Sequence, residues 1–277
     1  MGSLPFHWHL VALALVVAIA WLHRVLVHDT HHRRRMGWAL VVLLVATMWP
    51  LGDLAQSVSL TAATVQRLLI MLVVAPLILL STTTELLVKL TYPAPVDAIV
   101  RRLAHPGMAI ILVTVLGTLT LSSPLVDWAA TSWGGHVVVL GVVLFVGLLL
   151  WVPALAIMPG AKRLSPAARS GYVFGSAIVV TSLSFVWIFA QHSLYPALHG
   201  QQAVLHMTPV FDQQLAGFVA KLGAYFPMWA VAYIMLFRAD ESGVSVDESP
   251  LHWADVERQL LRIDRKQARA IRRHRPN

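Results

Sequence analysis

The sequence contains no cysteine, and this absence excludes several kinds of site at once. Disulfide bonds, thiolate metal sites, cysteine nucleophiles and iron–sulfur ligation all require a thiol. Charged residues are also scarce, because they make up 12% of the 277 residues, whereas 57% are hydrophobic. A soluble domain of this length carries about twice that share of charge. The composition therefore excludes a soluble enzyme, a disordered protein and a coiled coil, and it indicates a polytopic membrane protein.

The short motifs of common soluble enzymes are missing as well. The sequence has no GxSxG, no Walker loop, no HExxH and no GxGxxG placed after a strand. We therefore expect no catalytic residue. Histidine, methionine and a few ionisable groups in or near the bilayer are the candidates for a binding site.

Seven apolar stretches are long enough to cross a bilayer as helices, which requires about 20 residues each. They predict an all-α membrane domain over residues 1–237. The first stretch lacks a small-residue cleavage site and is expected to be a membrane helix, not a signal peptide. The spans are expected at Trp8–Val27, Trp38–Ala55, Ala62–Leu80, Met108–Val126, Val137–Met158, Tyr172–Ala190 and Gln214–Phe237.

The distribution of lysine and arginine predicts the orientation. Of the 21 basic residues, all but Arg67 and Lys221 lie in or next to the first, third and fifth loops or after the last span. The second, fourth and sixth loops have none. The positive-inside rule therefore predicts an external N-terminus and a cytoplasmic C-terminus. This topology accounts for the net charge of +8 without a nucleic-acid partner.

The segment after the last span is expected to be a separate element. Residues 238–248 have the composition of a polar linker, and residues 249–277 that of a basic amphipathic helix. Its apolar stripe consists of Trp253, Val256, Leu260 and Ile263. Two interpretations stay open: the helix lies on the anionic lipid of the inner leaflet, or it docks on a partner protein.

Six of the 13 histidines lie on the predicted outer side, and four of them are candidate metal ligands. His192, His199 and His206 follow one another at intervals of seven, and His136 begins the fifth span. Imidazole and thioether groups suit copper, so copper is the metal that this set favours. The alternative is that these histidines bind water and lipid headgroups at the interface. On the inner side, the cluster His28–Arg35 is expected to anchor the topology, because its arginines repel a metal ion.

Two cations are expected inside the membrane. Arg67 and Lys221 lie in predicted spans, where a charged side chain costs at least a few kcal/mol and is a functional candidate by default. Gln214, Gly217, Lys221 and Tyr225 share one helix face by their spacing. Two interpretations stay open: a buried ion pair or snorkelling, and an anionic ligand such as a haem propionate or an acidic partner residue. For Arg67 the expected anionic neighbour is Asp212 or Asp53.

Several runs resemble the multi-spanning CtaG family of cytochrome c oxidase assembly factors. The most specific is Asp212-Gln-Gln-Leu-Ala-Gly217, which opens the last span. The supporting runs are Val65–Leu72 with Ala75-Pro76, His105-Pro106, Gly147 with Trp151, Leu164–Arg169 with Tyr172, Leu194–Pro196 and Pro227–Trp229. The resemblance implies seven spans and a role in maturing a haem–copper oxidase by handling copper. Together with the absence of a cleavable signal peptide, it implies a bacterial plasma membrane.

The same resemblance shows where this chain departs from the family. The family pattern His-Met-x-Gln-His in the third span reads Ala63-Thr-Val-Gln-Arg67 here, so both histidines are absent. The Trp-His-x-Pro pattern reads Leu121–Pro124, and the His-x3-Glu-His pattern reads His136–Leu140. Of the ligand set that the family implies, His136 remains, with Gln66 and Asp212 beside it.

The sequence therefore favours an accessory protein of a respiratory haem–copper oxidase or related membrane complex, acting mainly as a scaffold with reduced copper handling. Membrane lipid and oxidase subunits are the expected partners. One alternative is a copper chaperone that uses the outer-side histidines. Another is a copper or small-ion permease that uses the polar faces of the fourth and sixth spans, which carry Thr114, Thr118, Ser122, Thr181 and Ser184.

Overall fold

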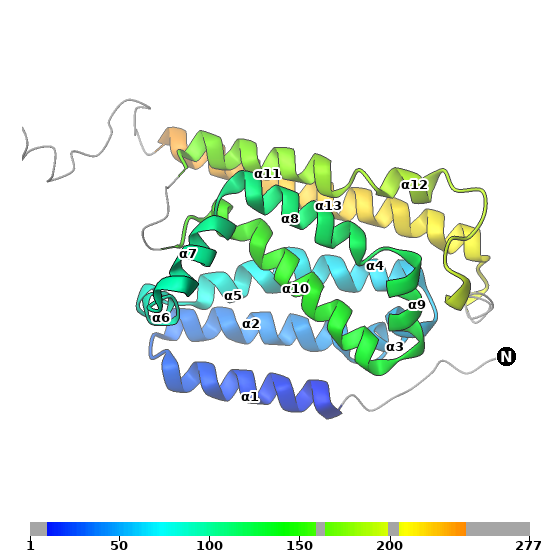
Figure 1. Cartoon of the computed structure of the whole chain (residues 1–277), viewed down its shortest axis with the longest axis horizontal. Helices are drawn as coiled ribbons and strands as arrows, with labels where there is room; N and C mark the ends of the chain where they lie inside the picture. The colour runs from blue at the N-terminus through cyan, green and yellow to red at the C-terminus, as the bar shows by residue number, and fades with distance from the viewer. Residues whose placement is uncertain (1–9, 159–163, 199–204, 242–277) are drawn as a thin grey trace, which may run out of the picture. The chain divides into compact units, whose positions relative to one another are not determined.

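The computed structural model describes residues 10–158, 164–198 and 205–241, which are helical with no strand among them (Figure 1). The expected all-α class is therefore confirmed. The elements are α1 (Leu10–Leu26), α2 (Thr30–Thr47), α3 (Leu51–Ser57), α4 (Leu60–Leu69), the π-helical turn η1 (Ile70–Val74), α5 (Ala75–Ser81), α6 (Thr84–Leu90), α7 (Ala94–Leu103), α8 (Pro106–Leu119), α9 (Ser123–Thr131), α10 (Trp133–Leu155), α11 (Pro166–Val180), α12 (Ser184–Ile188), the 3-10 turn η2 (Pro196–Leu198) and α13 (Pro209–Glu241).

Among the described residues, four helical segments are long and apolar enough to cross a membrane, or six if each of two bent pairs forms one span. The four are Leu60–Ser81, Trp133–Leu155, Pro166–Ile188 and Pro209–Arg238. The pairs are α2 with α3, bent by 52°, and α7 with α8, bent by 80°. Helix α1 covers most of the first predicted span but is shorter, with 17 residues. Seven spans and their orientation therefore stay predictions.

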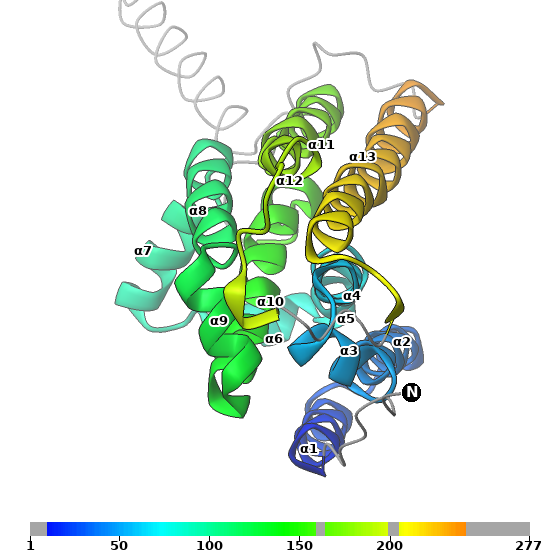
Figure 2. The ribbon, with the colours of Figure 1, turned by 90° about the vertical axis from the view of Figure 1, so that its right-hand side faces the viewer.

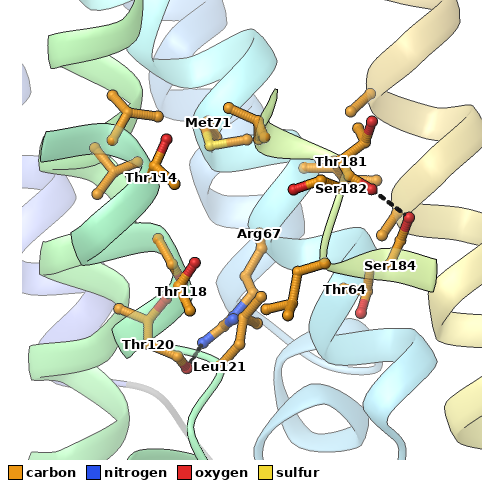
Figure 3. A pocket seen from close by; sticks show the side chains of 18 of the residues that line it. Thr64, Arg67, Met71, Thr114, Thr118, Thr120, Leu121, Thr181, Ser182 and Ser184 are labelled. Carbon is orange, nitrogen blue, oxygen red and sulfur yellow. Dashed lines mark hydrogen bonds between the residues drawn. The ribbon is translucent and has the colours of Figure 1, made fainter. Parts of the chain in front are cut away.

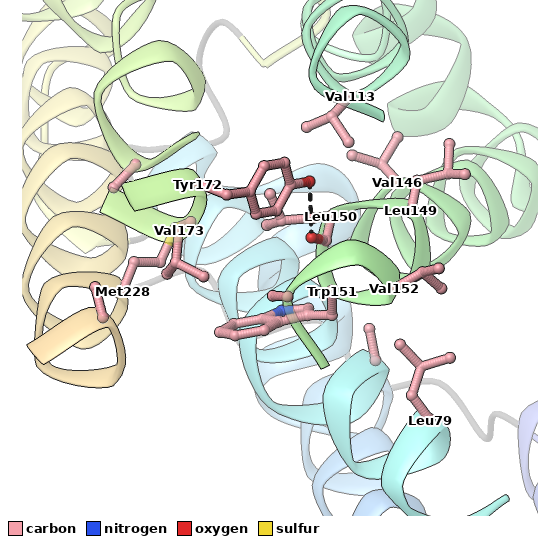
Figure 4. Close-up of a cluster of buried hydrophobic side chains, with 14 residues drawn as sticks. Leu79, Val113, Val146, Leu149, Leu150, Trp151, Val152, Tyr172, Val173 and Met228 are labelled. Atoms are coloured by element: carbon pink, nitrogen blue, oxygen red, sulfur yellow. Dashed lines mark hydrogen bonds between the residues drawn. The ribbon is translucent and has the colours of Figure 1, made fainter. Parts of the chain in front are cut away.

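Helix α10 lies in the middle of the arrangement and packs against α8, α9, α5, η1 and α11 (Figures 1 and 2). On the other side of η1 and α5 lies α2, which α1 then covers. The largest buried cluster joins α10 to α11 and α13 (Figure 4). In it, the Tyr172 hydroxyl donates a hydrogen bond of 3.0 Å to the Leu150 carbonyl.

Three predicted spans are interrupted, which hydropathy alone did not indicate. The second span, expected over Trp38–Ala55, is wrong as one straight helix, because α2 ends at Thr47 and α3 begins at Leu51 after a bend of 52°. The sixth span is interrupted between α11 and α12, at residues 181–183.

The fourth span, expected over Met108–Val126, is also wrong as one helix, because α8 ends at Leu119 and the chain turns before α9. Pro124 lies in the first turn of α9, where its missing N–H leaves no carbonyl unpaired. The interruptions free backbone carbonyls that need donors from elsewhere.

The third span contains a π-helical turn, η1, in which each hydrogen bond joins two residues that are five positions apart in the sequence. The Ala75 N–H donates to the Ile70 carbonyl, and the next pair in that register is Pro76 with Met71. Proline has no N–H, so the Met71 carbonyl accepts from the Trp151 indole instead, at 3.0 Å. A Cβ at Gly147 would lie 2.9 Å from the Met71 Cα, so only glycine allows α10 this close.

Most of the basic cluster, from Thr30 to Arg35, is helical rather than a loop. Helix α2 begins at Thr30, because the Asp29 carboxylate accepts from the His31 N–H at 2.7 Å. That hydrogen bond lowers the pKa of Asp29 below its ordinary value. Arg33 donates to the Val27 carbonyl, just past the end of α1. Arg35 donates to the Leu80 carbonyl at the end of α5, at 3.1 Å, so these arginines stabilise helix C-termini.

The predicted boundary between the membrane domain and the linker lies inside a helix, because α13 continues to Glu241. Residues 238–241 are therefore helical, contrary to the expected linker. The remaining linker residues and the predicted helix over 249–277 lie outside the described residues.

Candidate functional site

Arg67 lies on α4, five residues after the start of the third predicted span, and lines two cavities. Its Nη2 donates a hydrogen bond to the Thr120 carbonyl, just past the end of α8 (Figure 3). The expected pair with Asp212 is wrong, because the Asp212 carboxylate is used elsewhere. Among the described residues, no carboxylate forms an ion pair with Arg67. The C-terminal end of α8 supplies the negative partial charge that Arg67 contacts.

The larger cavity has a volume of about 110 Å³ and lies between α4, α8, α10, α13 and the break between α11 and α12. Its wall is mostly aliphatic, but several hydroxyl groups face it from α8 and from the break (Figure 3). Thr114 and Thr118 come from the fourth predicted span, and Thr181 and Ser184 from the sixth. The polar faces noted in the sequence therefore line one cavity together with Arg67, although Ser122 is not among the lining residues.

The smaller cavity, of about 40 Å³, collects the positions that the family resemblance singles out. Ala63, Gln66, Arg67 and His136 all line it. Gln66 is buried, and its Nε2 donates to the Ala46 carbonyl in the last turn of α2 at 2.8 Å. The fold thus brings His136 next to the face of α4 on which the family pattern has two histidines. In this chain the same face carries Ala63, Gln66 and Arg67 instead.

Lys221, the second cation, lies on α13 and contacts the break in the sixth span. Its Nζ donates to Thr181 Oγ1 at 3.2 Å, where α11 ends. The same nitrogen lies 4.3 Å from the centre of the Phe185 ring and 5.3 Å from that of Tyr225. A helix C-terminus and two aromatic faces stabilise an ammonium group without a carboxylate. Lys221 therefore has one hydroxyl acceptor and two aromatic rings as partners.

Asp212 is fully buried and joins the start of α13 to the start of α4. Its carboxylate accepts from Ser59 Oγ at 2.7 Å, from the Leu60 N–H at 2.7 Å and from the Thr61 N–H at 3.1 Å. These N–H groups have no partner inside α4, and the N-terminal end of a helix favours an anion. Asp212 is therefore a cap for another helix and not a counter-ion for Arg67.

The next residues of the same run fasten the segment that follows α12. Gln213 accepts from the Leu194 N–H at 2.8 Å, and Gln214 donates to the Ala190 carbonyl at 3.1 Å. At Gly217 a Cβ would lie 2.9 Å from the Ser184 carbonyl oxygen, so a larger residue would push α13 away from α12. The predicted shared face of Gln214, Gly217 and Lys221 is confirmed, because all three contact the segment from Thr181 to Ala190.

Tyr195 lies at the predicted outer end of the same region, and sequence reasoning missed it as a site residue. Its hydroxyl donates to the Leu121 carbonyl at 2.8 Å and accepts from the Trp187 indole at 2.8 Å. Burial raises the pKa of Tyr195 to about 12, so the phenol stays protonated and can donate. Arg67 therefore donates to the Thr120 carbonyl and Tyr195 to the neighbouring Leu121 carbonyl, and both carbonyls lie just past the end of α8.

Other residues of the family runs also fasten helix ends. Ser165 caps α11 by accepting from the Ala168 N–H at 3.2 Å, and Arg169 Nε donates to the Ala154 carbonyl in the last turn of α10. The sequence of these runs shows side chains that can form hydrogen bonds near prolines. Which backbone group each side chain contacts depends on helix packing, and only the structure shows that packing.

The histidines proposed as metal ligands are not brought together in the described residues. His192 and His206 are exposed, His136 lies in the smaller cavity, and His199 lies outside the described residues. Within the described ranges, no group of three or more His, Asp or Glu side chains could hold a metal ion. The described geometry therefore offers cations and hydroxyl groups, not a metal-binding cluster.

Comparison with known proteins was made over the whole chain. The family model described as cytochrome c oxidase caa3 assembly factor (Caa3_CtaG) matches residues 14–241. No curated protein and no solved structure matches the chain. The family match covers α2 to α13 and all of the helix-end contacts described above, including the Asp212 cap. The chain therefore belongs to the Caa3_CtaG family of cytochrome c oxidase assembly factors.

Proposed function

We propose that this protein assists assembly of a haem–copper oxidase as a membrane scaffold, with copper handling reduced relative to its family. The family match supports a role with cytochrome c oxidase. The observation that carries the finer proposal is the smaller cavity, in which Arg67 and Ala63 stand where the family pattern has histidines. A guanidinium cannot ligate a metal and stays protonated at any working pH.

The arrangement of the site supports a structural role. Asp212 fastens the start of α13 to the start of α4, and Gln213 and Gln214 fasten it to the segment that follows α12. Lys221 is likewise occupied by Thr181 and two rings. Residues held in this way give a rigid helical surface, which suits docking on a membrane partner.

The test is copurification from native membranes, with subunits of the oxidase identified by mass spectrometry and metal measured in the same sample. We expect oxidase subunits and substoichiometric copper. An unrelated polytopic protein from the same membrane, carrying the same tag, is the control. Stoichiometric copper without oxidase subunits would contradict the proposal and support a copper chaperone.

A second measurement separates the two roles in the cell. A strain that lacks this chain is expected to lose oxidase activity, and added copper is expected not to restore it, because a scaffold cannot be replaced by its metal. Restoration by copper alone would identify delivery of copper as the missing step. The exposed His192 and His206 would then be the residues to change first.

A further inference from the structure

We propose that the cavity beside Arg67 is a binding site for a carboxylate that carries a short apolar chain. The proposal rests on this cavity and not on the oxidase role. The cavity lies between α4, α8, α10, α13 and the break between α11 and α12, within the predicted membrane spans, and Arg67 is the only charged residue among the described residues that line it.

The charge of Arg67 is only partly compensated. Its one acceptor among the described residues is the Thr120 carbonyl, whereas a guanidinium has five N–H donors. A helix C-terminus carries about half of a negative elementary charge, which is smaller than the full positive charge of the guanidinium. In a site of low dielectric constant an anion adds strong stabilisation. The contrast is Lys221, which has two aromatic rings in addition to its hydroxyl acceptor.

The remaining wall favours one negative charge and an apolar body. Most of the hydroxyl groups donate their protons to carbonyls of their own helix or turn, as Thr114 does to Ile110 and Ser184 to Thr181. These neutral hydroxyl groups therefore have no free proton to donate to a ligand, and aliphatic side chains form most of the remaining wall. With a single cation, a monoanion fits better than a phosphate dianion. A carboxylate also matches the planar fork of a guanidinium.

The size of the cavity limits the apolar part of the ligand. An apolar cavity of about 150 Å³ holds a benzene molecule, so about 110 Å³ suits a chain of a few carbon atoms. The break in the sixth span forms one wall, and irregular backbone at membrane depth is tolerated where it lines a cavity. Butyrate is therefore a suitable probe, and butanol is its uncharged counterpart.

The test uses the full chain in nanodiscs and measures binding of radiolabelled butyrate by scintillation proximity. We expect saturable binding that unlabelled butyrate displaces and that butanol, at the same concentration, does not. Arg67→Met is expected to weaken binding about tenfold or more, because a charge-assisted hydrogen bond is lost. Equal binding to Arg67→Met, or equal displacement by butanol, would overturn the proposal.

A second variant keeps Arg67 and its bond to Thr120. Gly117 lines the cavity, and a Cβ there meets nothing within 4 Å. Gly117→Val is therefore expected to fill the cavity and abolish butyrate binding while the protein stays folded. Gly141→Val is the matched control, because a Cβ at Gly141 also meets nothing within 4 Å and Gly141 does not line the cavity. Unchanged binding to Gly117→Val would overturn the proposal.

Discussion

The Asp212 carboxylate accepts a hydrogen bond of 2.7 Å from the backbone N–H of Leu60, which lies 152 residues earlier in the chain. This contact joins the first turn of α13 to the first turn of α4. It shows a principle that recurs in the fold: a helix end that would leave backbone groups unpaired in the membrane receives its partner from a distant helix. Arg67 does the same at the end of α8.

We predict that Asp212→Ala destabilises the protein by about 1–3 kcal/mol for each buried donor that it leaves without an acceptor. The donors are Ser59 Oγ, the Leu60 N–H and the Thr61 N–H. The measurement is thermal unfolding in detergent, followed by tryptophan fluorescence. Asp97→Ala is the control, because Asp97 pairs with Arg101 at an exposed site, where an ion pair contributes at most about 1 kcal/mol. Equal losses in the two variants would show that the Asp212 cap does not stabilise the fold.

A second prediction concerns the π-helical turn. Trp151→Phe removes the donor to the Met71 carbonyl, and we expect a loss of about 1–2 kcal/mol in the free energy of unfolding. In a Pro76→Ala background the loss should be smaller, because residue 76 then supplies an N–H to the same turn. A double-mutant cycle measures this coupling and cancels the packing change at position 151. Additive losses would mean that Pro76 is not the reason for the indole hydrogen bond.

Most of the helical framework was predictable from the sequence, because hydropathy and proline placement report where apolar helices begin and end. The shared face of Gln214, Gly217 and Lys221 was predictable too, since helical spacing alone determines it. The break at residues 181–183 was not predicted, although Thr181, Ser182 and Ser184 make this stretch polar, because serine and threonine also occur inside unbroken membrane helices. Its stability depends on contacts such as the one from Lys221 to Thr181, and those follow from tertiary packing.

The role of Asp212 was misjudged for a related reason. Charge alone suggested a pair with Arg67, since both were expected near the predicted outer side. The structure shows that α4 begins beside the start of α13, so three donors lie closer to the carboxylate than any cation. Sequence patterns identify a buried acid as important, but the choice between a cap and an ion pair depends on which helix end lies next to it.

A third prediction concerns orientation, which follows from the basic loops and not from the helix packing. Reporters fused after Phe237 or within residues 162–169 are expected to read cytoplasmic, and fusions within residues 192–206 external. Enzymatic reporters that are active on only one side of the membrane provide the measurement. An external C-terminus would contradict the seven-span arrangement.

The last prediction concerns copper in the smaller cavity, which Ala63, Gln66, Arg67 and His136 line together. Arg67 repels a metal ion there and cannot ligate it. Ala63→His together with Arg67→His is therefore expected to raise bound copper, because two imidazoles then face the cavity beside His136. Metal analysis of the untagged protein measures this, and the same pair of changes combined with His136→Ala is the control. We expect the control to lose the added copper, since three imidazoles hold copper more strongly than two. Stoichiometric copper in the unmodified protein that disappears on changing Gln66 or His136 would contradict this account, because it would show a functioning site despite Arg67.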